Sequence, residues 1–181
     1  MIKEIIKSYS FVIPVKDEEN TIALLFTTIR EVMMSVELDD FEVIFIDDGS
    51  SDGSWCIMKQ LALDYPLQVR AIRLRRNFGK SVALAAGFQE ASGDIVFTMD
   101  ADLQDDPHEI PKFIEKIDDG YDVVSGWKEN RQDPFSKTLP SKFFNTVTSL
   151  ITGIKLHDFN CGFKAYRREV KNSLKVYGEM H

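Results

Sequence analysis

Carboxylates gather where one short apolar run ends. The segment DIVFTMDADLQDDP at 94–107 closes in four acidic residues, among them Asp100 and Asp102. An apolar run of this length predicts a strand buried on both faces. Side chains alternate along an extended chain, so Asp100 and Asp102 are expected to point the same way and to bind one hard cation. A lone D-x-D is short and also occurs without metal. Asp106, before Pro107, is predicted to cap the next helix instead.

Three other apolar runs end in polar residues in the same way. We expect strands at 9–15, 41–46 and 69–74, rich in β-branched and aromatic residues. The polar clusters that follow them are KDEEN at 16–20, DDGSSDG at 47–53 and RRNFGK at 75–80. Taken alone, the second cluster is also typical of an ordinary turn.

Helices are predicted between these runs. Apolar residues recur at helical spacing in 21–36, 54–65, 81–91 and 107–118, and a further strand is expected at 121–125. This alternation predicts an α/β fold with a mostly parallel sheet flanked by helices, since parallel neighbours need crossover connections. Ligands of such sheets bind beyond the carboxyl ends of the strands, so all four polar clusters are expected at one edge.

Composition narrows the class of protein. A length of 181 residues with 44% hydrophobic and 28% charged residues suits one globular domain and argues against disorder. No apolar run reaches the roughly 18 residues of a membrane span, and charges interrupt the N-terminal segment, so the chain as given is expected to be soluble and not exported. Two cysteines suit a reducing compartment, and Cys56 is predicted to lie in the core.

Charge is unevenly distributed along the chain. Residues 126–181 hold 10 Lys or Arg against 5 Asp or Glu, whereas residues 1–125 hold 12 against 24, which together give the net charge of −7. The basic part contains a predicted helix at 136–151 and a half-exposed strand within DFNCGFKAYRR at 158–168. An acidic segment can bind metal, and a basic one can face phosphates or an anionic membrane, although it can equally be a solvated surface.

In their order along the chain, the motifs resemble those of glycosyltransferase family 2, which has the GT-A fold, and of its polyprenyl-phosphate branch, which includes bactoprenol glucosyltransferases and dolichol-phosphate mannose synthases. The motifs that carry the resemblance are FVIPVKDEEN, FIDDGSSDGS, RRNFGKSVALAAG, MDADLQDDP and DFNCGFKAYRR. It implies one catalytic domain over residues 1–181, with a nucleotide-sugar and metal half at 1–125 and an acceptor half at 126–181. Full-length members usually continue into membrane-associated helices, so we expect this domain to be truncated before them.

The resemblance also implies roles for residues. It assigns Mg²⁺ or Mn²⁺ to Asp100, Asp102 and Gln104, with Asp102 also counted as catalytic. It assigns the nucleotide sugar to residues at the strand ends: Pro14, Val15, Glu18, Asp47, Asp48, Arg76, Asn77, Lys80, Asp100 and Ala101. RRNFGK followed by ALAAG looks more like the branch that uses UDP-sugars, so a UDP-sugar is favoured and GDP-mannose is possible.

The same resemblance implies that the basic half, residues 126–181, binds the acceptor. Lys137 and Ser141 are expected to hold the lipid phosphate, helped by Lys128 and Arg131. Lysine presents a point charge where many relatives have the bidentate fork of arginine. Asp158 is the candidate general base, yet an acceptor phosphate is already largely ionised at neutral pH, so this residue can serve instead to orient the acceptor.

The function implied is an inverting transfer of a sugar from a nucleotide sugar to a polyprenyl phosphate at the cytoplasmic face of the membrane, with no nucleic-acid partner. A family 2 transferase acting on a saccharide hydroxyl is the alternative, and it would require a true base at Asp158. A phospho-receiver switch also has acidic strand ends on a parallel sheet. The D-x-D pair, the basic C-terminal third and the length of the chain argue against such a switch.

Overall fold

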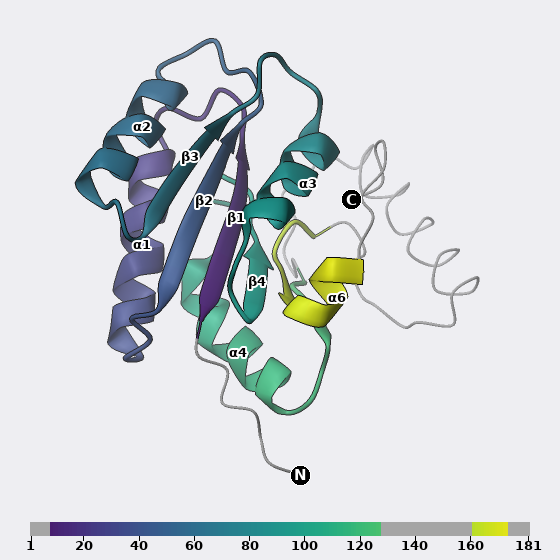
Figure 1. Ribbon diagram of the computed structural model, residues 1–181. Coiled ribbons are helices and arrows are strands. Elements are labelled where there is room, and N and C mark those ends of the chain that lie inside the picture. The colour runs from purple at the N-terminus through teal and green to yellow at the C-terminus, as the bar shows by residue number, and fades with distance from the viewer. Residues whose placement is uncertain (1–7, 128–160, 174–181) are drawn as a thin grey trace, which may run out of the picture.

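In the computed structural model of the protein, residues 8–127 and 161–173 are described, and they form one six-stranded sheet with helices on both faces (Figure 1). The elements in chain order are β1 Tyr9–Val15, α1 Ile22–Ser35, β2 Phe41–Asp47, α2 Ser54–Asp64, β3 Val69–Arg73, α3 Lys80–Glu90, β4 Ile95–Thr98, the 3₁₀ turn η1 Pro107–Glu109, α4 Ile110–Asp118, β5 Val123–Ser125, β6 Lys164–Arg167 and α6 Arg168–Ser173. Every strand and helix predicted within these residues is present. The helix expected at 136–151 lies outside them.

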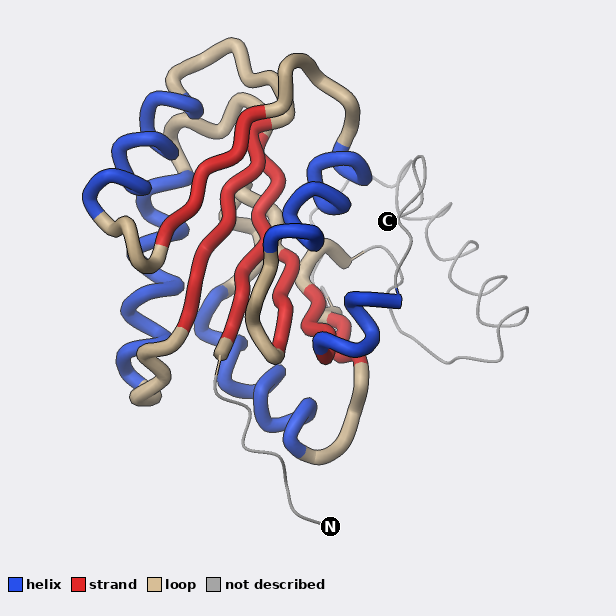
Figure 2. Tube along the Cα trace, in the orientation of Figure 1, coloured by secondary structure: helices blue, strands red, loops and turns tan. Residues whose placement is uncertain are grey.

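The strand order is β3-β2-β1-β4-β6-β5. β3, β2, β1 and β4 are parallel, whereas β6 runs antiparallel to both of its neighbours, β4 and β5. The prediction of a mostly parallel sheet is therefore correct for these four strands. Figure 2 shows the strands of the sheet flanked by helices. The chain reverses its direction of travel across the sheet between β1 and β4, which is where ligands of such sheets bind.

Each central strand is apolar on both faces, as a doubly covered parallel strand must be. In β1, Phe11 and Ile13 pack on the face that α1, α2 and α4 cover, while Val12 packs against α3 on the other. In β4, Phe97 stacks on Phe11 with ring centroids 4.9 Å apart. β1, β2 and β4 are therefore held between two hydrophobic layers, which fixes the positions of their ends.

Two predictions about single residues had opposite outcomes. The carboxylate of Asp106 accepts a hydrogen bond from the backbone N–H of His108, 2.9 Å away, and this bond is the main cause of the lowered pKa of Asp106, so the predicted helix cap is confirmed. Cys56 was predicted to lie in the core and is exposed, so that prediction is wrong. Cys56 follows the partly buried Trp55 on α2, and one residue of helical rotation carries its side chain away from the sheet.

Basic residues of the C-terminal segment are engaged by the fold. Lys171 donates to the carbonyl oxygens of Phe88 and Ala91, at 3.0 and 3.1 Å, and so completes the end of α3. Burial lowers the pKa of Lys171. Arg168 pairs with Asp94 at 2.9 Å, and Arg167 donates to the carbonyl oxygen of Tyr121. These three cations hold β6 and α6 in place, so the positive charge counted in this part of the sequence is partly structural.

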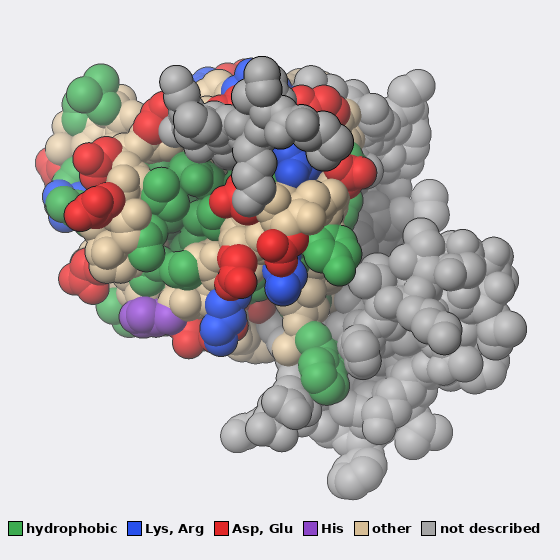
Figure 3. Space-filling view, turned by 90° about the horizontal axis from the view of Figure 1, so that it is seen from below, with side chains coloured by type: hydrophobic (Ala, Val, Ile, Leu, Met, Phe, Trp, Pro, Cys, Tyr) green, Lys and Arg blue, Asp and Glu red, His purple; other side chains and the backbone are tan. Residues whose placement is uncertain are grey.

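The edge of the sheet away from the carboxyl ends of the parallel strands has mixed charge. Seen from below, Lys and Arg side chains lie beside Asp and Glu side chains (Figure 3). On α4, Lys112 pairs with Glu109 at 2.8 Å and Lys116 pairs with Asp119 at 3.0 Å. Exposed pairs of this kind contribute little to stability.

Candidate functional site

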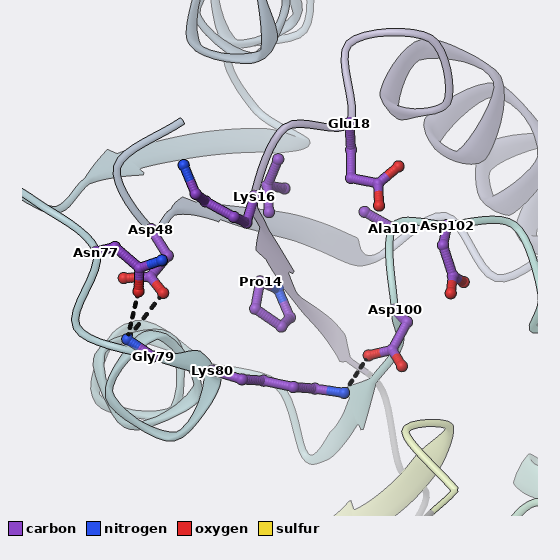
Figure 4. Close-up of a pocket in the computed structure, with 11 residues that line it drawn as sticks. Pro14, Lys16, Glu18, Asp48, Asn77, Gly79, Lys80, Asp100, Ala101 and Asp102 are labelled. Carbon is purple, nitrogen blue, oxygen red and sulfur yellow. Dashed lines mark hydrogen bonds and ion pairs between the residues drawn. The ribbon is translucent and has the colours of Figure 1, made fainter. Parts of the chain in front are cut away.

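A pocket of about 360 Å³ opens at the carboxyl ends of β1, β2 and β4. Figure 4 shows side chains from these strand ends and from the start of α3 arranged around it. The residues that line it are Pro14, Val15, Lys16, Glu18, Asp48, Asn77, Gly79, Lys80, Asp100, Ala101 and Asp102. Eight of the ten residues expected to bind the nucleotide sugar are among them, and so is the D-x-D pair. The structure thus brings together polar clusters that are more than 80 residues apart in the sequence.

The two carboxylates of the D-x-D pair lie in this pocket, as predicted. The predicted cause, alternation of side chains along a strand, is wrong. β4 ends at Thr98, and Ala101–Leu103 form a turn in which Leu103 has a φ of 60°. Asp100 and Asp102 are both half-buried, and the carboxylate of Asp102 accepts a hydrogen bond from the backbone N–H of Gln104 at 3.0 Å. The turn places both carboxylates at the pocket. A strand that continued through these residues would have extended past it.

The donor set suits a hard divalent cation that is shared with a ligand. In the part of the chain that the structure describes, no group of three or more His, Cys, Asp or Glu side chains is placed to hold a metal ion. Mg²⁺ is commonly bound by one or two carboxylates together with substrate phosphates, so the pair Asp100 and Asp102 fits this use. Gln104 is exposed and does not line the pocket, so the structure does not bring the third predicted ligand to the other two.

A cation lies beside the acidic pair. The ammonium of Lys80 is 2.5 Å from Oδ1 of Asp100 (Figure 4). Lys80 is the first residue of α3, and Gly79 before it has a φ of 93°, a conformation that favours glycine. The N-terminus of a helix favours anions, because its first N–H groups have no partners within the helix. This side of the pocket is therefore suited to an anionic group such as a phosphate.

The loop before α3 is held by Asp48. One carboxylate oxygen of Asp48 accepts from the N–H of Phe78 at 2.7 Å, and the other accepts from the N–H of Gly79 at 2.9 Å. Asp48 is only 4% exposed. Its carboxylate thus shapes the loop that presents Asn77 and Lys80 to the pocket.

Asp47 and Arg76, both predicted to bind the nucleotide sugar, are not in the pocket lining. Asp47 is fully buried, accepts from the N–H of Ser50 at 2.7 Å, and has Nε of Arg73 3.1 Å from its other oxygen. The guanidinium of Arg76 is exposed and stacks over the ring of Phe78, 4.8 Å from its centroid. The structure gives both residues contacts within the protein at these positions.

The loop after β1 is joined to the loop after β2 by hydrogen bonds. The N–H of Ser51 donates to the carboxylate of Asp17 at 2.7 Å, and this bond is the main cause that lowers the pKa of Asp17 to about 2. The N–H of Asp17 donates to the hydroxyl of Ser50, and that of Glu18 donates to the hydroxyl of Ser54. These contacts fix the wall of the pocket to which Glu18 belongs.

Sequence reasoning missed two pocket residues, Lys16 and Gly79. Lys16 directly follows β1, and its ammonium contacts the carbonyl oxygen of Gly49 at 2.8 Å and the carboxylate of Asp17 at 2.9 Å. Both residues stand inside the polar clusters identified at the strand exits. Their place at a strand exit was a usable signal, but nothing in the sequence said which members of a cluster face inward.

Five predicted site residues lie outside the described part of the chain: Asp158, Lys128, Arg131, Lys137 and Ser141. Among the described residues, no helix is both long enough and apolar enough to span a bilayer.

Comparison with known proteins agrees with this geometry. Relatives of known activity include an undecaprenyl-phosphate 4-deoxy-4-formamido-L-arabinose transferase of Pectobacterium carotovorum, 40% identical over 93% of this chain and 51% of its own length. A dodecaprenyl-phosphate galacturonate synthase of Rhizobium johnstonii is 36% identical over 95% of this chain and 51% of its own length. The chain thus spans about half the length of these relatives.

Solved structures share the fold. A mannosyltransferase of Pyrobaculum calidifontis, in complex with GDP-mannose and Mn²⁺, has a TM-score of 0.68 at 22% identity and covers 94% of this chain and 47% of its own. A glucosyl-3-phosphoglycerate synthase of Mycobacterium tuberculosis, in complex with Mn²⁺, UDP-glucose and phosphoglyceric acid, has a TM-score of 0.68 at 21% identity and covers 91% of this chain and 57% of its own. These are GT-A glycosyltransferases, and the sheet described above has the GT-A fold. The family model for glycosyl transferase family 2 matches residues 10–174, which is nearly the whole chain. The chain therefore belongs to that family.

Proposed function

We propose that this chain is the catalytic part of a metal-dependent glycosyltransferase that moves a sugar from a nucleotide sugar to a polyprenyl phosphate. The observation that carries the proposal is the pocket in which Asp100 and Asp102 lie beside Lys80 at the reversal point of the sheet. A nucleotide sugar has an anionic diphosphate next to the bond that must break, and this pocket places cation-binding carboxylates and a cationic helix start within one small volume.

Four residues of the pocket have a part in this reaction. Asp100 and Asp102 would hold Mg²⁺ or Mn²⁺, which when bound would supply Lewis acidity to the leaving diphosphate. Lys80 and the first N–H groups of α3 stabilise the negative charge that develops on the leaving group. Asp48 keeps the loop before α3 in shape, so that Lys80 needs no rearrangement as the bond breaks.

We infer the donor from the segments RRNFGK and ALAAG and the acceptor from the relatives. We favour a UDP-sugar as donor, with GDP-mannose as the other candidate. Relatives named for undecaprenyl phosphate and for dodecaprenyl phosphate support a polyprenyl phosphate as the acceptor. The acceptor phosphate would be bound by Lys128, Arg131, Lys137 and Ser141, and the reaction would invert the anomeric carbon without a covalent enzyme intermediate. A reaction on a membrane lipid places the protein at a membrane surface, and we assign it to the cytoplasmic face.

The decisive experiment offers the protein two acceptors that differ in one group. Transfer from UDP-sugars and from GDP-mannose is measured with undecaprenyl phosphate and with undecaprenol, in the presence of Mn²⁺ or after its removal by EDTA. We expect a product only with the phosphate, lost with EDTA and recovered with Mn²⁺. Transfer to a free hydroxyl, or equal transfer in EDTA, would contradict the proposal.

The role of Asp158 is tested in the same assay by its pH dependence. With a phosphate acceptor, the low-pH limb of kcat follows ionisation of the phosphate and should persist in Asp158→Asn. With a hydroxyl acceptor, the limb would belong to Asp158 and disappear with it, together with the 10²- to 10⁴-fold that general-base catalysis typically contributes. We expect the first result.

A further inference from the structure

We propose that Gly162 is a positioning residue for Asp100: its missing side chain lets the backbone that leads into β6 lie directly against the Asp100 carboxylate and set its direction. The proposal rests on the proposed function only in so far as Asp100 is a metal ligand. It concerns how two parts of the chain, 62 residues apart in the numbering, meet at one carboxylate.

The contact between Gly162 and Asp100 is closer than any side chain would allow. A methyl group on Gly162 would lie 2.6 Å from Oδ2 of Asp100 and 2.8 Å from both its Cγ and its Oδ1, and these are the three heavy atoms nearest to it. Separations below 3.0 Å essentially never occur for a real Cβ. Gly162 is not among the residues with positive φ, so its backbone conformation does not itself require glycine. The need for glycine at this position comes from Asp100.

The backbone of Gly162 is firmly held. Its carbonyl oxygen accepts a hydrogen bond from the hydroxyl of Thr98 at 2.8 Å, and Thr98 pairs with Lys164 in the β4–β6 register. On either side of Gly162, Cys161 and Phe163 are 3% and 4% exposed, and Phe163 stacks on Phe113 with ring centroids 4.2 Å apart. A clash at Gly162 is therefore relieved by movement of the Asp100 carboxylate, because the β6 segment is anchored and a carboxylate can rotate.

The carboxylate is confined from two directions. Lys80 lies 2.5 Å from Oδ1 of Asp100, and the backbone of Gly162 lies against both oxygens. In Figure 4 the yellow trace that contains this segment passes beside Asp100, opposite the pocket wall formed by Glu18. The segment that leads into β6 thus holds a pocket carboxylate in place, although neither Gly162 nor any residue of β6 lines the pocket. A change at Gly162 should alter cation binding without touching the cation.

The test measures binding of Mn²⁺ alone by electron paramagnetic resonance, in the parent chain, in Gly162→Ala and in Gly126→Ala. We expect Gly162→Ala to weaken Mn²⁺ roughly 10- to 100-fold, the usual effect of losing support behind a metal ligand. Gly126→Ala is the matched control. Its methyl group would lie 3.1 Å from Sγ of Cys161 and 3.2 Å from the carbonyl oxygen of Phe163, so it crowds the same segment without meeting Asp100. Its Mn²⁺ affinity should equal that of the parent chain.

A thermal-unfolding cycle keeps the contact testable without metal. Gly162→Ala should lower the temperature midpoint of unfolding, and adding Asp100→Ala, which removes the carboxylate, should restore it. If the Gly162→Ala chain does not fold, the double variant should fold. An undiminished Mn²⁺ affinity in Gly162→Ala, or an equal loss of midpoint with and without the Asp100 carboxylate, overturns the proposal. Failure of the parent chain to bind Mn²⁺ would count against the metal in the proposed function, and the cycle would still decide the contact.

Discussion

Two acidic pairs stand at the exits of β2 and β4, the strands on either side of β1, and the tertiary structure gives them different surroundings. Asp47 and Asp48, after β2, are 0% and 4% exposed, and three of their four carboxylate oxygens accept backbone N–H groups while the fourth faces Arg73. Asp100 and Asp102, after β4, are half-buried and line the pocket beside Lys80. The first pair serves as scaffold for the protein's own loops, although Asp48 also lines the pocket, whereas the carboxylates of the second pair are open to a ligand. A carboxylate already surrounded by N–H donors has little capacity left for a cation, so the surroundings separate these roles.

The difference originates in how closely neighbouring loops approach. After β2, the turn at Gly49 presses on the loop before α3, where a methyl group on Gly49 would lie 2.5 Å from the backbone nitrogen of Asn77. Two backbones so close leave N–H groups that need acceptors, and Asp48 supplies them. After β4, the backbone that lies close to Asp100 is that of Gly162, and the pocket side is left to the side chain of Lys80.

The largest contrast is expected when the same substitution is made in both pairs. Asp102→Asn keeps the shape of the side chain and an acceptor for the N–H of Gln104 while removing the charge. Transfer activity should fall by at least roughly 100-fold, since even residues that merely support a metal ligand contribute 10- to 100-fold. The thermal midpoint should stay close to that of the parent chain. Unchanged dependence on divalent cations in this variant would remove Asp102 from the metal site.

Asp48→Asn should lower the stability of the fold, which Asp102→Asn leaves close to that of the parent chain. Asparagine offers one acceptor oxygen where the carboxylate offers two, so its NH₂ would face the N–H of Gly79, which keeps Oδ1 of Asn77 at 3.0 Å as a second acceptor. The free energy of unfolding in urea should therefore fall by about 1 kcal/mol, the usual net contribution of one hydrogen bond. If Asp48→Asn proves as stable as Asp102→Asn, the distinction between scaffold and ligand-binding pair fails.

Lys80→Met addresses the cation beside the second pair and should give the smallest effect. It removes the ammonium that lies 2.5 Å from Asp100, so Mn²⁺ alone should bind more tightly, while the KM for the nucleotide sugar should rise. The Lys80 side chain is 32% exposed, so solvent screening limits the gain in Mn²⁺ affinity to about fivefold.

Lys16→Met is the control for Lys80, because its ammonium is held by Asp17 and by the carbonyl oxygen of Gly49 and not by the D-x-D pair. The Mn²⁺ affinity of Lys16→Met should match that of the parent chain. Equal gains in both variants would mean that the pocket responds only to its total charge.

The elements themselves could be predicted from the sequence. Helical and strand periodicities are local consequences of which face of an element is buried, and the predicted strand 9–15 and the helix predicted at 81–91 match β1 and α3 to within one residue. Four parallel strands place their exits at one edge, so the pocket could also be located. Cys56 was misassigned because an apolar side chain on an amphipathic helix is buried or exposed according to the packing of α2 on the sheet.

The order of the elements and the set of polar residues at their ends can therefore be read from the sequence alone. Which of these carboxylates stay open to a ligand depends on the tertiary structure, because the role of a carboxylate depends on the donors that the rest of the fold brings to it. Asp48 meets two N–H groups from a loop 30 residues away, and Asp100 meets Lys80 and the bare backbone of Gly162. Such long-range neighbours leave no local pattern in the sequence, since closeness in space is created by strand pairing and helix packing.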